Sequence, residues 1–207
     1  MKRGVKMGKY RVIAIERQYA SGGKEIGKLV AEKLGIPFYN REILEMAAKK
    51  LGVRPENIEH AEESAAKSLL SSFAMMSRID GDPEKVLPLQ DRLFITESKI
   101  ITDLTRTQSC VIVGRGAGDI LREDESCLRV FIYADVYSRI ERAVNEYMCA
   151  PEDAERILKQ HDRRRSSFYD SHSLKKWSDM NTYDVCLNSG ALGSRVCART
   201  IIDIFSK

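Results

Sequence analysis

The chain has 207 residues, of which 43% are hydrophobic and 31% charged, so it is long enough for one globular domain with a normal core. Its formal net charge of +4 at pH 7 suits a binder of phosphorylated small molecules and is too small to indicate a nucleic-acid partner. No apolar run is long enough to span a bilayer and no signal-peptide pattern is present, so we expect no membrane partner.

An apolar run, a turn of small residues and an amphipathic helix follow one another over residues 10–35. The run at 12–15 predicts a strand buried on both faces of a parallel sheet. The turn at Ser21, Gly22 and Gly23 lets backbone N–H groups approach a ligand, and the helix after it directs a partial positive charge there. This layout predicts a phosphate-binding loop, with an ordinary glycine-rich turn as the alternative.

The loop departs from the Walker spelling G-x-x-x-x-G-K-[ST]. In one register Arg17 stands at the first glycine, Gly23 at the lysine and Lys24 at the hydroxyl residue. In the other register Gln18 takes the first position and Glu25 replaces the hydroxyl residue. Both registers lack the usual hydroxyl ligand for Mg²⁺ but keep positive charge. Because a charged hydrogen bond is worth about 1.5–3 kcal/mol, we expect the loop to hold phosphate if Arg17 or Lys24 reaches it.

The next part of the chain predicts helices around a short extended piece at 36–39. Asn40 is a candidate N-cap for the helix that follows this piece. Residues 53–82 are weakly apolar and rich in Glu, Ser and Ala, which predicts loosely packed helices that project from the sheet. A helical insertion over 53–85 has two possible packing partners, which are a second copy of the chain and the core of its own chain. Residues 86–107 have the apolar spacing of a longer amphipathic helix.

Three further apolar runs predict strands at 110–113, 128–133 and 184–188. Pro151 stands at the first position of a basic helix, and an apolar helix closes the chain. Short apolar strands that alternate with helices indicate an α/β fold, in which a parallel sheet is covered on both faces.

Ligands of such sheets bind outside the carboxyl ends of the strands. Three segments fall at these ends: 17–25, Gly114 to Gly116, and 188–190. Arg115 stands between two glycines, and its planar fork suits bidentate contact with a phosphate. A turn arginine in solvent is the alternative.

A charged stretch follows the predicted strand at 128–133. It includes Arg139, Glu141, Arg142, Arg156, Lys159, Asp162, Arg163, Arg164 and Arg165. Such a run is either a solvated helix face or a lid that brings arginines over a triphosphate. Asp162 is placed to orient a neighbouring arginine or to meet a base edge.

The five cysteines are odd in number and form no C-x-x-C pair, and the three histidines show no zinc spacing. Cys110 and Cys186 flank apolar runs, which is typical of buried free thiols in a reducing compartment. We therefore expect a cytoplasmic protein.

On these residues the chain resembles the cytidylate kinase-like family, a branch of the P-loop nucleoside monophosphate kinases. The resemblance lies in IAIERQYASGGKEIGKLVAEKLGIPFYNREIL, VIVGRGAGDIL, RVFIYADVYSRIERA, ILKQHDRRRSSFYD and YDVCLNSGALG. The altered loop is typical of this branch. The resemblance implies a P-loop NTPase-type three-layer α/β fold with a roughly five-stranded parallel sheet, a helical monophosphate-binding insertion and a lid.

A single kinase-like domain would then comprise a core, an insertion and a lid. The core would cover 10–52, 86–147 and 184–207, with the insertion at 53–85 and the lid at 148–172. The implied partners are small-molecule nucleotides, with a possible homodimer through 53–85.

The resemblance also implies transfer of the ATP γ-phosphoryl group to a (d)CMP-like acceptor with Mg²⁺, whose protein ligands stay unknown. The residues that match the donor-phosphate loop are Arg17, Ser21, Gly22, Gly23, Lys24 and Glu25. Those that match the acceptor site are Arg41, Gly114, Arg115 and Gly116. Those that match transfer positions are Lys24, Arg139, Asp162 and Arg165.

Two departures from authentic cytidylate kinases keep other functions open. The Walker lysine and hydroxyl are replaced, and Gly116 stands where an acidic residue often follows Gly-Arg. The alternatives are a nucleotide-binding regulatory protein with weak or no turnover, and a P-loop kinase for another small acceptor such as a shikimate-like compound.

Overall fold

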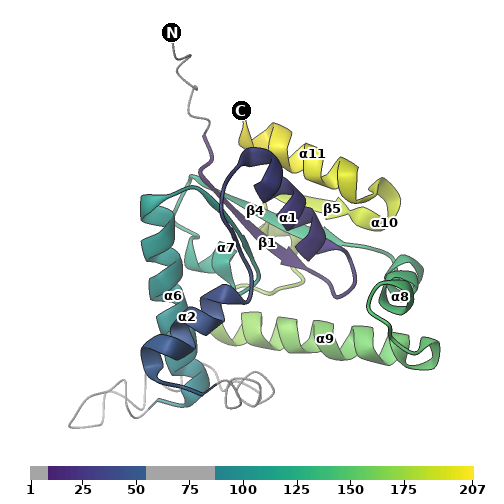
Figure 1. The fold of residues 1–207 in the computed structure, drawn as a ribbon, viewed down its shortest axis with the longest axis horizontal. Coiled ribbons are helices and arrows are strands. Elements are labelled where there is room, and N and C mark those ends of the chain that lie inside the picture. The colour runs from purple at the N-terminus through teal and green to yellow at the C-terminus, as the bar shows by residue number, and fades with distance from the viewer. Residues whose placement is uncertain (1–8, 55–86) are drawn as a thin grey trace.

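A computed structural model of the protein describes residues 9–54 and 87–207. Five strands form one parallel sheet with the order β2-β3-β1-β4-β5 (Figure 1). The strands are β1 (Val12–Arg17), β2 (Phe38–Tyr39), β3 (Cys110–Val113), β4 (Cys127–Tyr133) and β5 (Val185–Asn188). The predicted α/β fold with a parallel sheet of about five strands is confirmed.

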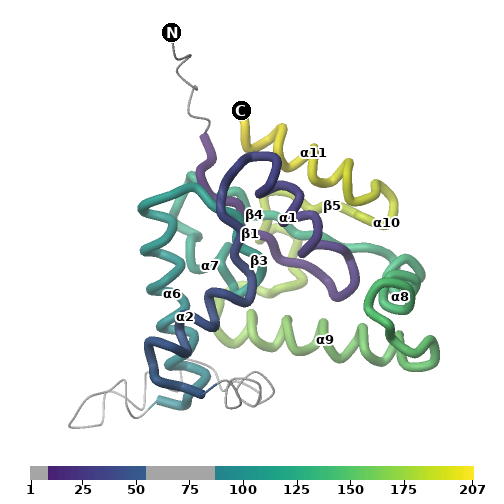
Figure 2. Tube along the Cα trace, viewed as in Figure 1, coloured from purple at the N-terminus to yellow at the C-terminus, as the bar shows by residue number. Residues whose placement is uncertain are grey.

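Helices cover both faces of the sheet, which gives three layers. The helices are α1 (Gly23–Leu34), α2 (Glu42–Leu51), α6 (Leu89–Thr107), α7 (Ala117–Ile120), α8 (Val136–Asn145), α9 (Pro151–His172), α10 (Ser189–Leu192) and α11 (Ser194–Phe205). Figure 2 shows α1 and α11 together on one side of the sheet, with α2 and α6 on the other.

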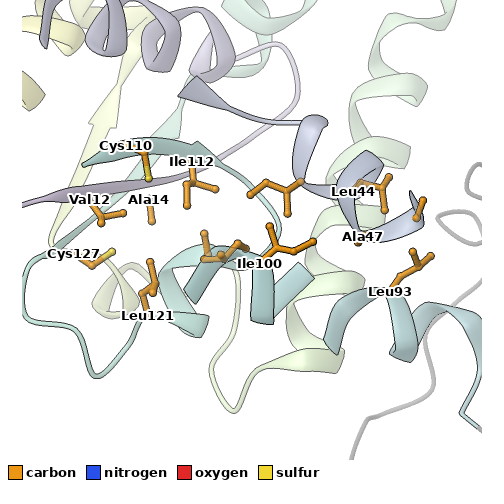
Figure 3. Packing of buried hydrophobic residues seen from close by; sticks show 14 residues of the cluster. Val12, Ala14, Leu44, Ala47, Leu93, Ile100, Cys110, Ile112, Leu121 and Cys127 are labelled. Carbon is orange, nitrogen blue, oxygen red and sulfur yellow. The ribbon is translucent and has the colours of Figure 1, made fainter. Parts of the chain in front are cut away.

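The central strand β1 is apolar at every core position because both of its faces are covered. Ile13 and Ile15 pack with side chains of α1 and α11. Val12 and Ala14 point to the opposite layer, where α2, α6 and α7 contribute Leu44, Ile100 and Ala117 among others (Figure 3). An alternating strand would leave one layer without a core, so the continuous run is what this architecture requires.

The start of α2 differs from the prediction that Asn40 caps it. The helix begins at Glu42 with Arg41 at the N-cap, and no side chain caps it. The Asn40 side chain instead lies 3.5 Å from Nη2 of Arg17, while its backbone N–H donates to Glu42. The longer helix begins at Leu89, three residues later than predicted. A proline disfavours the helical conformation in the residue before it, and Pro88 itself is the N-cap, with a ψ of 146°. Pro151 occupies the first turn of α9 as predicted.

The predicted insertion and the homodimer contact through 53–85 fall almost wholly outside the described residues. Within the two described ranges, no helix combines the length and apolar character that a bilayer crossing requires.

Candidate functional site

The loop between β1 and α1 is anchored to the end of β4. The backbone N–H of Gln18 donates to the carbonyl oxygen of Ile132 (3.0 Å), and its side-chain oxygen accepts from the N–H of Ala134 (3.2 Å). Ala20 and Gly22 both adopt left-handed backbone conformations, with φ of 57° and 74°. The chain therefore turns sharply twice before α1 begins at Gly23, as a loop that wraps a small ligand must.

The hydroxyl of Ser21 is used inside the protein. The Ser21 side chain is buried, and its Oγ lies 2.9 Å from the carbonyl oxygen of Gln18 and 3.1 Å from that of Ile132. The Oγ of Ser189 in turn lies 2.6 Å from the Ser21 carbonyl oxygen. Ser21 thus has its hydroxyl committed to the backbone, and its own backbone N–H donates to the Gln18 carbonyl oxygen at 3.3 Å, so Ser21 shapes the loop. Ser189 follows β5, in the strand-end segment 188–190, but its hydrogen bond to the loop was not predicted.

A buried ion pair holds the loop at Tyr19. The Asp162 carboxylate accepts the backbone N–H of Tyr19 at 2.7 Å and a guanidinium N–H of Arg139 at 2.5 Å. Arg139 donates in addition to the Tyr19 carbonyl oxygen at 3.3 Å. The side chains of Arg139 and Asp162 are only 9% and 17% exposed. Both residues were predicted to take part in transfer, and the structure places them in contact with the loop backbone at Tyr19.

Two more arginines reach the loop from the same helices. Arg142 donates to the carbonyl oxygen of Ala20 (3.3 Å), and its guanidinium lies so close to Gly22 that a Cβ there would be 2.9 Å from Nη1. Arg165 donates to the carbonyl oxygen of Arg17 (3.1 Å). Burial lowers the pKa of Arg165, against the opposing influence of the Asp162 carboxylate. Loop carbonyls are therefore turned toward guanidinium groups, and α9, which makes up most of the predicted lid region, is fastened to the loop (Figure 1).

The first turn of α1 carries Lys24 and Glu25. Lys24 is exposed and Glu25 is partly buried. One Glu25 oxygen accepts from the Tyr147 hydroxyl at 3.4 Å, while the other is buried and has no hydrogen-bond partner among the described residues. The first backbone N–H groups of the helix have no intrahelical acceptor, so this end presents donors and a partial positive charge.

The strand-end segment after β3 is strained and partly buried. Gly114, Arg115 and Gly116 all have positive φ, of 81°, 63° and 63°. Arg115 lies 3.5 Å from the carboxylate of Glu97, and the two side chains are 19% and 1% exposed. The alternative of a turn arginine in solvent is therefore wrong. A left-handed arginine costs about 1–3 kcal/mol, and such strain is concentrated at functional sites.

Two acidic residues of this site were not predicted. Glu97 sits on the apolar face of α6, where a carboxylate among core positions was the available signal. Glu16, on β1, accepts the backbone N–H of Gly116 (3.2 Å) and lies 3.4 Å from the indole nitrogen of Trp177. Burial raises the pKa of Glu16, and Arg17 opposes the rise. Both carboxylates fix the segment that carries Arg115.

Arg17 and Arg41 lie on the same side of the site. The Arg17 side chain runs from the end of β1 past Gly114. Arg41 is exposed and lies 3.5 Å from Glu45 of the same helix. The structure therefore brings Arg17 to the segment of Arg115, and leaves Arg41 at the rim.

Aromatic rings from α6 and α9 line a small cavity beside Gly116. The ring of His172 lies 4.1 Å from that of Phe94 and 4.7 Å from that of Phe168. The Nδ1 of His172 lies 2.7 Å from the Phe168 carbonyl oxygen, and its Nε2 faces Asp91 at 3.8 Å. These rings pack against one another between α6 and α9, and the His172 side chain is only 3% exposed.

Across residues 9–54 and 87–207, no three His, Cys, Asp or Glu side chains gather into a metal site.

A central parallel strand that leads through a tight loop into a helix N-terminus, ringed by arginines at the carboxyl edge of the sheet, defines a P-loop kinase fold. Residues 12–191 match the cytidylate kinase-like family, so the chain belongs to this family. A search of curated proteins finds no match.

Solved structures share the fold. An uncharacterized protein from Eubacterium ventriosum ATCC 27560 aligns with a TM-score of 0.71 at 24% identity, over 95% of this chain and 99% of that chain. A gluconokinase from Sinorhizobium meliloti 1021 aligns with a TM-score of 0.54 at 17% identity, over 96% and 93%. A shikimate kinase from Acinetobacter baumannii in complex with shikimate aligns with a TM-score of 0.51 at 13% identity, over 96% and 94%.

Proposed function

We propose that the protein is a phosphotransferase that moves the γ-phosphoryl group of ATP to a nucleoside monophosphate such as CMP or dCMP. The observation that carries this proposal is the convergence of Arg17, Arg115 and Arg165 with the N-terminus of α1 at one edge of the sheet. Membership of the cytidylate kinase-like family supports the same reaction.

The donor phosphates would lie in the loop and against the start of α1. Backbone N–H groups from Gly22 to Glu25 would bind the phosphate oxygens, with Gly22 and Gly23 allowing the close approach. Lys24 is exposed in this turn and free to meet a phosphate from the solvent side. Arg139 and Asp162 would act by holding Tyr19 and therefore the loop.

The acceptor would bind with its phosphate at the segment Gly114 to Gly116. Arg115 would contact this phosphate, with Arg41 at the rim. The partly buried rings of Phe94 and Phe168 would flank the remainder of the acceptor, since flat apolar walls suit a nucleobase. Phosphoryl transfer depends mainly on positioning and on stabilising the charge of the equatorial oxygens, which is what an arginine cluster does.

Glu25 fits a role with Mg²⁺. Its unpartnered, buried carboxylate oxygen lies in the turn where other P-loops carry the hydroxyl ligand. When bound, Mg²⁺ would neutralise charge on the β- and γ-phosphates of ATP.

The test is steady-state ADP formation with ATP and a panel of acceptors: CMP, dCMP, UMP, other monophosphates, shikimate and gluconate. We expect turnover with a pyrimidine monophosphate. The Arg115→Ala variant should raise KM for the monophosphate, whereas Arg199→Ala, which removes an exposed arginine of α11, should not. Absence of ADP above background with every acceptor would refute the proposal.

A second candidate is a nucleotide-binding regulatory protein with little turnover. It is favoured by the commitment of Arg139 and Asp162 to the loop, which removes two charges from direct contact with the transferred group. Binding of ATP without turnover of any acceptor would select this second candidate.

A further inference from the structure

The side chain of Arg17 connects the donor loop with the acceptor segment. Arg17 is the last residue of the central strand β1, and its guanidinium extends sideways over Gly114, directly after β3. Its Nη2 reaches to 3.5 Å from the side-chain oxygen of Asn40, directly after β2. The guanidinium therefore crosses three neighbouring strand ends, from the loop toward the side of the sheet that carries Arg41 and Arg115.

Two glycines leave room for this path. A Cβ at Gly23 would lie 2.6 Å from Cβ of Arg17, and a Cβ at Gly114 would overlap Nη1 of Arg17. One glycine belongs to the donor loop and the other to the acceptor segment. A side chain at either glycine would collide with Arg17 and displace it.

The surroundings of Arg17 are rich in positive charge. Burial, and then the neighbouring Arg165, lower the pKa of Arg17 to about 9, with Arg115 adding to the effect and Glu16 opposing it. The guanidinium still carries its charge at pH 7. Three guanidinium groups held this close repel one another, so an anion placed between them would be strongly favoured.

Lys24 has a different environment. It is exposed in the first turn of α1, and within residues 9–54 and 87–207 its amine makes no hydrogen bond or ion pair. Of the two cations that the altered loop retains, Arg17 is the one whose guanidinium reaches the segment Gly114 to Gly116.

We propose that Arg17 is a catalytic residue whose guanidinium contacts the transferred phosphoryl group, in the role that the lysine of G-K-[ST] has in other P-loop proteins. This inference rests on the proposed kinase function. In the step, an acceptor phosphate oxygen forms a bond to the γ-phosphorus while the bond to the β–γ bridging oxygen breaks and ADP leaves with that electron pair. Arg17 neutralises charge on the equatorial oxygens and exchanges no proton.

The test measures ATP and ADP binding by calorimetry, because only ATP carries the phosphoryl group in question. Arg17→Ala should weaken ATP binding about 10- to 100-fold, the value of a charged hydrogen bond, and weaken ADP binding far less. Arg17→Lys, which keeps the charge but not the planar fork, should fall between the wild type and Arg17→Ala. Circular dichroism melting checks that each variant is folded.

A pair of glycine variants tests the same point without touching Arg17. Gly114→Ala and Gly35→Ala both place alanine at a positive φ, of 81° and 64°, but nothing lies within 4 Å of a Cβ at Gly35. Both should lose similar stability, and only Gly114→Ala should reproduce the loss of ATP-over-ADP selectivity. Equal weakening of ATP and ADP by Arg17→Ala overturns the inference, as does a larger loss of selectivity in Lys24→Ala.

The acceptor panel separates this inference from the proposed function. Turnover with an unchanged ATP-over-ADP ratio in Arg17→Ala would leave the kinase assignment standing and refute the role of Arg17. Selective ATP binding that depends on Arg17, without turnover of any acceptor, would support the inference and refute the kinase. A wild-type protein that binds no ATP would refute both.

Discussion

Removal of the Asp162 carboxylate should release the loop between β1 and α1. Asp162 is the acceptor for the backbone N–H of Tyr19 at 2.7 Å and for Arg139 at 2.5 Å. In Asp162→Ala, the Tyr19 N–H loses its acceptor and Arg139 keeps a buried charge without its carboxylate. We therefore expect both lower stability and a loop that no longer holds a phosphate.

The magnitude follows from the burial of the pair. Its side chains are 9% and 17% exposed, so solvent screens the interaction little. Truncating one partner of a buried ion pair costs about 3–5 kcal/mol. In Arg139→Met/Asp162→Leu, no lone charge remains. This double variant should therefore lose less than the single variants Arg139→Met and Asp162→Leu added together, by about 1–3 kcal/mol.

Urea unfolding of the four proteins of this double-mutant cycle measures the coupling. The matched control is the pair Glu155 and Lys159 on the solvent face of the same helix, whose side chains are 60% and 75% exposed. Glu155→Ala should leave the stability close to that of the wild type, because exposed pairs contribute little. A cost for Asp162→Ala no larger than for Glu155→Ala, or strict additivity of the buried pair, would refute the reasoning.

Three more predictions concern the acceptor segment, a histidine and the thiols. Glu97→Ala should release Arg115 from its carboxylate partner at 3.5 Å. The KM for the monophosphate should then rise several-fold more than the KM for ATP, and Glu97→Gln should rescue it in part. Equal changes in the two KM values would contradict this prediction. Burial lowers the pKa of His172 below the value of about 6.5 of the unfolded chain, so the neutral ring stabilises the fold fully above that pH and the contribution is lost as pH falls through the folded-state pKa. His172→Phe should therefore flatten the decline of unfolding free energy between pH 7 and pH 5 measured in urea, and an unchanged slope would argue against it. Burial raises the pKa of Cys110 to about 11 and of Cys127 to about 12. Neither thiol should therefore react with Ellman's reagent at pH 8 until urea unfolds the protein. Labelling of either cysteine in the native state, located by mass spectrometry, would count against a buried site.

Local sequence was sufficient for the elements of the core. The continuous apolar runs of β1, β3 and β4 predicted strands covered on both faces, and each appears within a residue or two of its expected bounds. The same signal located the strand ends, and with them the loop and the segment of Arg115. These signals are the hydrophobic period, the glycine turns and Pro151. Each depends only on neighbouring residues, so the structure that it predicts can be inferred without the tertiary structure.

The partners of the charged residues were not readable in this way. Arg139 and Asp162 are distant in sequence from Tyr19, and nothing in the charge run distinguishes a pair that clamps a backbone from a solvated face. Glu16 and Glu97 interrupt apolar patterns, which signals a buried carboxylate but not its partner.

The sequence by itself therefore determined the class of fold, the order of its elements along the chain and the edge where a ligand binds, because these depend on local periodicity and on the shared direction of parallel strands. Only the tertiary structure decided that β3 lies between β1 and β2, and that Arg17 rather than Lys24 faces the acceptor segment. Strand order and the direction of a long side chain depend on which distant surfaces pack together and which charges they bury. That competition is settled by the folded protein as a whole.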